Sequence, residues 1–447
     1  MMRFKLSKLA EIAGGRVIGD DVEVHGMLHD ARRIETGNLF CALPGEHHDG
    51  HAFLDQARDN GAAAALVSRA ADHALPRVVV DDVRDAMGRI ARAWREQLDV
   101  EVVGITGSNG KTTVKEMVAA ILSTQGPTLA TQGNYNNELG VPLTLARLDA
   151  SHRYAVVEMG CNRPGDIDYL ASIARPDVGV VTNAGPAHLE RLGSVAGVAR
   201  TKGEMFSALP ADGTAVINAD DEFAPLWREL AGERRIISFG SDGAANVSGV
   251  LSRGTALINT PSGDFCFEPA LPGRHNFLNA LAATAVAVAL AVPLAAVAQG
   301  LSGMRSLPGR LQSHRHADGW QLIDDSYNAN PASLAAALDV LSGQQGSERW
   351  LVLGDMAELG PDGPRLHAEM GRSARDAGVD RLYALGELAR SSADAFDGPA
   401  RHFESRDALM AALAEALRPG VICLVKGSRS MGMERVVEGL LGEVNPC

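Results

Sequence analysis

The sequence predicts an α/β protein in three parts, with parallel sheets in the central and C-terminal parts. At 447 residues the chain is longer than one ordinary domain. From residue 100 onward a short apolar run, a polar turn and a helix-like segment succeed one another repeatedly, which is typical of strands buried in a parallel sheet. A glycine-rich turn follows the first of these runs. We expect the parts to span residues 1–97, 98–306 and 307–447.

Composition and charge narrow the class of protein. Acidic residues outnumber basic ones by 55 to 42, giving a net charge of −13, which disfavours a nucleic-acid-binding protein. The cysteines are scattered, so a disulfide framework or a thiolate zinc site is not expected. The N-terminus has no apolar core of the signal-peptide type. We therefore expect a cytoplasmic protein. The cysteines are Cys41, Cys161, Cys266, Cys423 and Cys447.

The first part mixes short strands and turns. The stretch GGRVIGDDVEVHGMLHD, which begins at Gly14, alternates and turns like a β-hairpin. GNLFCALPG and GAAAALVS have the character of short buried strands, with a helix expected in HAFLDQARDNG between them. Residues 82–100 are predicted to form a helix that leads into the second part.

In the second part, four apolar runs each end in a polar residue. Since functional side chains gather at the carboxyl ends of parallel strands, we expect a site there. The later segment ALAATAVAVALAVPLAAVA is alanine-rich and interrupted by Pro293, which favours two buried helices, the second opened by the proline, over a membrane span. The polar residues that end the runs are Thr106, Glu158, Asn183 and Asp220.

The third part has the same pattern of strands that end in polar or glycine turns. Its apolar runs are WQLIDD, RWLVLG, RLYALG and GVICLVKGS, which indicate a second, smaller α/β unit. The chain shows no internal repeat and no low-complexity linker, so close packing of the parts is expected.

The stretch GITGSNGKTTVKEM carries the clearest chemical signal. A strand precedes it and a helix follows, so the turn from Gly107 to Gly110 can present backbone N–H groups to phosphate at a helix N-terminus. Lys111 is then placed to reach the β- and γ-phosphates, and Thr112 to bind Mg²⁺. The alternative is an ordinary strand–helix turn, which the agreement of strand, spacing and helix disfavours.

Other polar residues are weaker candidates on spacing alone. Glu158 ends the strand YAVVEMG, which is the usual place for a second metal ligand beside a phosphate loop. His188 follows the next strand, and Lys202 lies in a helix-like segment. Taken singly, a histidine or lysine in such places is usually structural or exposed.

Several motifs, taken together, resemble the Mur ligase family of ATP-dependent amide-bond-forming enzymes of peptidoglycan synthesis. They are TGSNGKTT, NAGPAHLERLGS, ARTKGEMF, GRHNFLNALAA, DDSYNANPAS and LVKGSRSMGMERV, in this order along the chain. The family writes its phosphate loop T-G-x-x-G-K-T-T, as here. The resemblance implies three domains: a small mixed α/β N-terminal domain that holds the UDP end of the substrate, a central P-loop ATPase domain with a parallel sheet, and a C-terminal Rossmann-like domain.

The resemblance also implies roles for individual residues. Lys111, Lys202, His188, Glu158 and Arg310 are expected to be catalytic. Lys202 is expected to be carbamylated, and an anionic carbamate could join a second Mg²⁺ site where an ammonium could not. The nucleotide is expected to contact Gly107, Ser108, Asn109, Gly110, Lys111, Thr112, Thr113, Asn276, Asn279, Arg310 and Asp325. The metal ligands are expected to be Thr112, Glu158, His188 and Lys202. The substrate-binding residues are expected to be Arg32, Asn136, Asn137, Asn328, Asn330, Asp355 and Glu358.

The motifs GNYNNELGVPLTL and LGDMAELG are most similar to those of the family member that joins D-alanyl-D-alanine to UDP-N-acetylmuramoyl-tripeptide. The implied cofactors are ATP and two Mg²⁺ ions, and the implied intermediate is an acyl phosphate. We expect a monomer without nucleic-acid or membrane partners, whose C-terminal domain closes over the nucleotide. One departure is Ala31, where the family commonly carries a hydroxyl residue before Arg32.

Two alternatives stay open at this point. One is a sister ligase that adds a single amino acid to a shorter UDP-muramyl peptide. The other is a nucleotide-dependent switch, which needs a phosphate loop but not His188, Lys202 and the amide pair Asn276 and Asn279 together.

Overall fold

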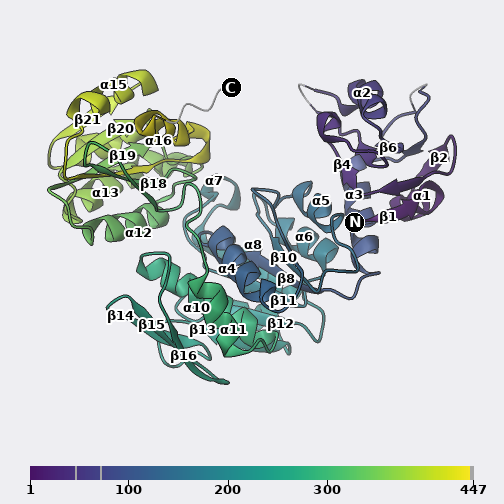
Figure 1. Ribbon diagram of the computed structural model, residues 1–447, viewed down its shortest axis with the longest axis horizontal. Helices are drawn as coiled ribbons and strands as arrows, with labels where there is room; N and C mark the ends of the chain where they lie inside the picture. Colours follow the sequence, from purple (N-terminus) through teal and green to yellow (C-terminus); the bar gives the residue numbers. More distant parts are fainter. Residues whose placement is uncertain (46–47, 71–72, 443–447) are drawn as a thin grey trace.

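The computed structural model describes residues 1–45, 48–70 and 73–442 and shows three α/β parts in an arc, with the central part between the other two (Figure 1). Cys447 lies outside the described residues. The central and C-terminal parts are built on parallel strands, so the predicted fold class is confirmed. The exact limits proposed for the three domains stay predictions.

The N-terminal part contains a mixed sheet in the order β2-β7-β6-β5-β4 and a separate pair formed by β1 and β3. The two runs predicted as buried strands, β5 and β6, are confirmed and fully buried. The elements are β1 Arg3–Lys5, α1 Leu6–Ala13, β2 Arg16–Ile18, β3 Glu23–His25, β4 Met27–Leu28, η1 Ala31–Arg33, β5 Leu39–Cys41, η2 Gly50–Phe53, α2 Leu54–Asp59, β6 Ala64–Val67, β7 Arg77–Val79 and α3 Val83–Arg95.

The predicted hairpin of β2 and β3 is wrong, because β2 pairs with β7 and β3 pairs with β1. The connection between β2 and β3 is instead hydrogen-bonded to helix α1. The Asp21 carboxylate accepts hydrogen bonds from Ser7 N at 2.7 Å and Ser7 Oγ at 2.9 Å. Val24 then packs into the core with Phe4 of β1. Tertiary packing has decided the pairing where no tight two-residue turn imposed it.

The central part is a parallel sheet in the order β13-β12-β11-β8-β10-β9, covered by helices on both faces. Adjacent residues of β8 belong to different cores: Val102 is part of the hydrophobic cluster that includes residues of α3, α6 and α8, and Val103 is part of the cluster that includes residues of α4, α10 and α11. The elements are β8 Glu101–Thr106, α4 Lys111–Ser123, β9 Thr128–Ala130, α5 Gly140–Leu145, β10 Tyr154–Glu158, α6 Asp166–Ala174, β11 Val178–Val181, α7 Leu189–Leu192, α8 Val195–Ser207, β12 Thr214–Asn218, α9 Ala224–Ala231, β13 Arg235–Phe239, α10 Arg274–Ala289 and α11 Leu294–Ser302.

The alanine-rich segment forms the two helices predicted, with Pro293 as the N-cap residue of α11. No helix among the described residues is long and apolar enough to cross a membrane. Between β13 and α10 lies a small antiparallel sheet that the sequence pattern did not predict, in the order β14-β15-β16. Its strands are β14 Ser248–Ser252, β15 Thr255–Thr260 and β16 Gly263–Phe267.

The C-terminal part has the sheet order β17-β18-β22-β19-β20-β21, in which only β17 runs antiparallel to its neighbour among the described strands. The four strands expected from the sequence, β18, β19, β20 and β22, are confirmed. The elements are β17 Gln312–Arg315, β18 Gln321–Asp325, α12 Pro331–Ser342, β19 Glu348–Gly354, η3 Gly360–Asp362, α13 Gly363–Asp376, β20 Arg381–Leu385, α14 Ala389–Ala395, β21 Ala400–Phe403, α15 Arg406–Ala416, β22 Val421–Lys426, η4 Arg429–Met431 and α16 Glu434–Leu441.

Close packing of α11 on α4 gives a stability test. A Cβ at Gly300 would lie 2.6 Å from the Cα atom of Ile121. Gly300→Ala should therefore destabilise the protein by about 1–3 kcal/mol, because overpacked backbone cannot move aside as a flexible side chain would. Urea unfolding should show a lower midpoint. Gly343→Ala, where the nearest atom is 3.6 Å away, is the matched control and should leave the midpoint nearly unchanged. An unaffected Gly300→Ala midpoint would contradict the packing described.

Candidate active site

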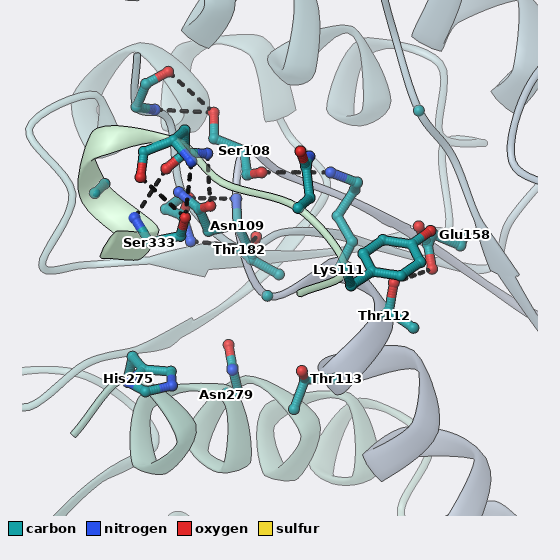
Figure 2. A pocket seen from close by; sticks show the side chains of 18 of the residues that line it. Ser108, Asn109, Lys111, Thr112, Thr113, Glu158, Thr182, His275, Asn279 and Ser333 are labelled. Atoms are coloured by element: carbon teal, nitrogen blue, oxygen red, sulfur yellow. Dashed lines mark hydrogen bonds between the residues drawn. The ribbon is translucent and has the colours of Figure 1, made fainter. Parts of the chain in front are cut away.

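A cavity of about 550 Å³ lies between the central and C-terminal parts, at the carboxyl ends of the central strands. It is lined by the glycine loop, the start of α4, the end of β10, the first turns of α10 and the segments around Arg310 and Tyr327. Figure 2 shows Lys111, Thr112 and Glu158 close together, with Asn279 and His275 along the helix that borders the pocket. The cavity therefore gathers residues from distant segments of the sequence.

Two of the four polar residues predicted at strand ends belong to this cavity. Glu158 and Asn183 line it, whereas Thr106 and Asp220 are absent from its lining. The Asp220 carboxylate instead accepts a hydrogen bond from Ser241 N at 2.8 Å. The strand-end rule thus located the site but did not distinguish its members from residues that support neighbouring turns.

Hydrogen bonds to the neighbouring strand end hold the glycine loop in place. Ser108 N and Asn109 N donate to the carbonyl and side-chain oxygens of Asn183, both at 3.0 Å. Ser108 Oγ donates to Gly185 O at 3.2 Å. Two of the loop N–H groups expected to face phosphate are thus engaged by Asn183. The cradle for an anion is therefore provided chiefly by the first turn of α4, whose N–H groups have no partner within the helix.

Gly110 is required where the loop meets α10. It is the N-cap residue of α4 and has a φ of 82°, in the left-handed region. A Cβ there would lie 2.4 Å from Asn279 Oδ1. A glycine therefore satisfies both the backbone conformation and the close approach of the Asn279 amide, which the resemblance implies as a nucleotide contact.

Lys111 lies at the buried end of the loop. Its Nζ donates to Gly107 O at 2.7 Å. Burial, together with the nearby positive charge of Lys202, lowers the pKa of Lys111 to about 8, while Glu158 opposes the shift. An anionic phosphate would favour the charged form again, so this lysine is arranged to gain most from a bound polyphosphate.

Thr112 and Glu158, two of the predicted metal ligands, lie in direct contact. Thr112 Oγ1 donates to Glu158 Oε2 at 2.9 Å, and Asn136 Nδ2 donates to Glu158 Oε1 at the same distance. Glu158 is only 2% exposed. A hydroxyl and a carboxylate oxygen are hard donors that suit Mg²⁺, which takes its further ligands from phosphate and water. The donor set thus fits a Mg²⁺–nucleotide complex.

The other two predicted metal ligands contact different groups. His188 Nδ1 lies 2.5 Å from Glu358 Oε2, and burial lowers the pKa of His188 although Glu358 opposes the shift. Lys202 is 1% exposed, and its Nζ donates to Cys161 Sγ at 3.5 Å. Within the described part of the chain, no group of three or more His, Cys, Asp or Glu side chains is placed to hold a metal together. The full ligand set thus stays a prediction.

The two asparagine amides predicted to contact the nucleotide lie in the first turns of α10 and are linked to each other. Asn279 Nδ2 donates to Asn276 Oδ1 at 3.2 Å, and Asn276 Nδ2 donates to Pro272 O at 2.7 Å. Both line the cavity, as does Thr113. Their amides are oriented by these bonds before any ligand arrives, which lowers the cost of ordering them on binding.

The C-terminal part closes the other side of the cavity. Arg310 Nη2 donates to Thr112 Oγ1 at 2.9 Å, and its guanidinium lies 4.4 Å from the centre of the Tyr327 ring. Asn330 Nδ2 donates to Asn109 Oδ1 at 2.8 Å. Two residues far along the chain from the loop thus meet it directly, in line with the contacts from both parts that the resemblance implied.

Asp325 lies beside a lysine that the sequence did not single out. Asp325 forms a buried ion pair with Lys426, whose Nζ also donates to Asn328 O at 2.9 Å. Asn328 Oδ1 accepts from Arg429 N at 3.3 Å. The ion pair holds the Asp325 carboxylate at the cavity wall. Lys426 lies in the motif LVKGS, so its place directly after an apolar strand was a signal available in the sequence.

The other residues predicted on the substrate side are divided between the cavity and distant places. Asn136 and Asn137 line the cavity. Arg32 does not; it is exposed in η1 and pairs with Asp30 at 2.9 Å. Asp355 is also absent from the cavity lining, and its carboxylate accepts a hydrogen bond from Ala389 N at 2.7 Å, at the start of α14. Substrate contacts of Arg32 and Asp355 therefore stay predictions.

Three cavity residues that the sequence patterns did not single out are Tyr327, His275 and Cys161. Tyr327 and His275 lie within the motifs SYNANP and RHNFLN, in which the asparagines gave the stronger signal. Burial lowers the pKa of His275, with the Asp325 carboxylate opposing this shift. Cys161 had no signal beyond its position three residues after Glu158.

A parallel sheet, a glycine loop that opens a helix, a lysine and a threonine at its start, and a facing carboxylate define a P-loop nucleotide-binding protein. The C-terminal α/β part supplies Arg310 to the same cavity, so within this class the protein is one whose nucleotide site is shared by two parts of the chain.

Comparison with known proteins agrees with this class. Residues 23–101 match the Mur ligase family catalytic domain, residues 105–287 the Mur ligase middle domain, and residues 309–429 the Mur ligase glutamate ligase domain. The UDP-N-acetylmuramoyl-tripeptide–D-alanyl-D-alanine ligase of Escherichia coli is 43% identical over 98% of this chain and 99% of its own.

Solved structures show the same similarity. MurF from Acinetobacter baumannii has a TM-score of 0.92 and 34% identity, over 99% of both chains. MurF ligase from Thermotoga maritima in complex with ADP has a TM-score of 0.82 and 27% identity, over 94% of this chain and 98% of that one. The chain belongs to the Mur ligase family.

The pKa of Lys111 gives a pH prediction. In the free protein Lys111 is charged below about pH 8 and loses its proton as the pH rises through that value. Affinity for a non-hydrolysable ATP analogue should therefore fall from pH 7 to pH 9, as measured by calorimetry. Lys111→Ala should bind at least about tenfold more weakly at pH 7 and lose most of this pH dependence. A Lys111→Ala variant with the full pH dependence would assign the effect to another group.

Proposed function

We propose that the protein is an ATP-dependent ligase that joins D-alanyl-D-alanine to UDP-N-acetylmuramoyl-tripeptide. The observation that carries the proposal is the contact of Arg310 with Thr112, which places a C-terminal cation at the phosphate loop inside one cavity. The full-length similarity to ligases named for this reaction supports the choice of substrates. We also infer that the enzyme acts as a monomer in the cytoplasm.

The chemistry follows from the charges around the loop. A carboxylate does not react with an amine unaided at neutral pH, so transfer of the γ-phosphoryl group of ATP first converts it to an acyl phosphate. Lys111 and Arg310 offset the negative charge of the phosphates and so allow the carboxylate anion to approach. The amine of the dipeptide then attacks the acyl carbon and phosphate leaves.

Mg²⁺ would be held by Thr112 and Glu158 and would neutralise phosphate oxygens when bound. Asn136 keeps the Glu158 carboxylate oriented toward Thr112. The acyl phosphate must be protected from water, and contacts from Asn330 and Arg310 to the loop are the kind that domain closure would tighten.

Phosphate release tests the proposed reaction. Release from ATP should require both UDP-N-acetylmuramoyl-tripeptide and D-alanyl-D-alanine, because the acyl phosphate forms on one and is consumed by the other. Mass spectrometry should show the joined product. Turnover with a single amino acid and a shorter UDP-muramyl peptide would instead identify a sister ligase. Steady phosphate release with neither substrate would indicate a switch.

We further propose that Lys202 is carbamylated in the working enzyme and joins a second Mg²⁺ site. Its Nζ is buried beside Cys161, and none of the ion pairs among the described residues includes it, so the ammonium form has no anionic partner there. Carbamylation would replace that cation with an anion in a cavity that already holds Lys111 and Arg310.

Lys202→Ala should reduce turnover by at least about a hundredfold, since a metal-binding anion is lost. Short carboxylic acids added to the assay should restore part of the activity by occupying the vacated space with a carboxylate. Lys115→Ala serves as a control for loss of a buried lysine near the loop, and its activity should not respond to added acid. Near-normal activity of Lys202→Ala without an additive would remove Lys202 from the mechanism.

A further inference from the structure

Arg33, next to the predicted substrate residue Arg32, makes a hydrogen bond from η1 to the central part. Arg32 turns back to Asp30 at the start of its own element. Arg33 instead donates from Nη1 to the hydroxyl oxygen of Tyr135 at 3.2 Å, across 102 positions of sequence. The N-terminal domain, which the resemblance implies holds the UDP end of the substrate, is thus connected directly to the loop that precedes α5.

The loop that carries Tyr135 leads to the carboxylate proposed to bind Mg²⁺. Asn136 is its next residue and donates to Glu158 Oε1 at 2.9 Å, while Thr112 donates to the other oxygen of Glu158. A displacement of Tyr135 would therefore reach Glu158 through one peptide unit and one hydrogen bond. Asn136 and Glu158 both line the cavity.

Two glycines allow the backbone nearby to pack closely against this loop. A Cβ at Gly140 would lie 2.2 Å from the carbonyl carbon of Tyr135, so the loop backbone packs directly on the start of α5. A Cβ at Gly160 would lie 3.1 Å from Asn136 Oδ1, and Gly160 N donates to Asn136 O at 2.7 Å. Closely packed groups of this kind move together rather than independently.

We propose that Arg33 is a positioning residue that couples occupancy of the N-terminal domain to the phosphate site through Tyr135, Asn136 and Glu158. The inference rests on the proposed function for the identity of the substrate. When the anionic diphosphate of the UDP end draws the Arg33 guanidinium, the hydrogen bond to Tyr135 adjusts the loop, and Glu158 is held in the orientation that suits a metal-bound nucleotide. Binding of one ligand then favours binding of the other.

The experiment measures this coupling directly. Calorimetry gives the affinity of a non-hydrolysable ATP analogue with Mg²⁺, in the absence and presence of saturating UDP-N-acetylmuramoyl-tripeptide. In the wild-type protein the tripeptide should tighten nucleotide binding about fivefold or more. Tyr135→Phe removes only the hydroxyl and should abolish most of this gain, with nucleotide affinity in the absence of tripeptide changed less than about twofold.

Matched variants separate coupling from simple loss of contacts. Arg33→Ala should behave like Tyr135→Phe, the double variant should be no worse than either single one, and Arg33→Lys should recover part of the coupling. In turnover assays the KM for ATP at saturating tripeptide should rise about fivefold in these variants, while the KM for ATP measured at low tripeptide stays constant. Arg58→Ala, which removes a surface cation paired with Asp55 and Asp59 in the same domain, should match wild type.

The outcomes distinguish the two proposals. If wild-type protein binds the nucleotide but neither binds the tripeptide nor turns over, the proposed function fails and this inference falls with it. If wild-type protein turns over but shows no coupling, or if Tyr135→Phe and Arg33→Ala retain it, the proposed function stands and the role of Arg33 is overturned.

Discussion

The hydroxyl of Thr112 joins the central part of this protein to its C-terminal part. It donates to Glu158 at the end of β10 and accepts from Arg310 of the C-terminal part, both at 2.9 Å. A threonine hydroxyl can donate one hydrogen bond and accept others, so it can serve a carboxylate and a guanidinium together. This small group places an anion and a cation beside the start of α4, where an incoming polyphosphate needs both a metal and positive charge.

Burial strengthens the electrostatic interactions among the charged groups of the cavity. Lys111, Lys202 and Glu158 lie in one cavity wall with little exposure of the latter two. Because the positive charge of Lys202 disfavours the charged form of Lys111, the free site gains from any anion that enters, whether phosphate or carbamate. The ion pair of Asp325 with Lys426 is different, since it is already balanced and holds its surroundings in place. The cavity therefore combines two kinds of charged group. Asp325 and Lys426 neutralise each other and hold nearby groups in position, whereas Lys111 and Lys202 leave positive charge that favours binding of an anion.

Local sequence patterns predicted the strands and helices of the central and C-terminal parts well, because buried parallel strands are continuous apolar runs. These patterns gave the wrong pairing for β2 and β3. Their pairing goes with the hydrogen bonds that Asp21 accepts from Ser7 and with the burial of Val24. The site was predictable at Lys111, Thr112 and Glu158, where chain order fixes geometry. It was not predictable at Tyr327 and Cys161, since their places depend on how the C-terminal part and β10 pack around the cavity, whereas Lys426 had a signal in its position at the end of an apolar run.

The division into three parts has a physical reason in the size of the proposed substrates. A nucleotide-sugar peptide has its anionic end far from the carboxylate that reacts, so one pocket cannot hold both ends and also exclude water from an acyl phosphate. Separate domains can hold the two ends of the substrate. The reacting site then needs a contact that links it to the domain that holds the distant end. The hydrogen bond from Arg33 to Tyr135 joins the N-terminal part to the loop of Asn136, and Arg310 joins the C-terminal part to Thr112. Both paths end on Glu158, through Asn136 at one carboxylate oxygen and through the Thr112 hydroxyl at the other, so contacts from the two outer parts meet at the carboxylate proposed to bind Mg²⁺.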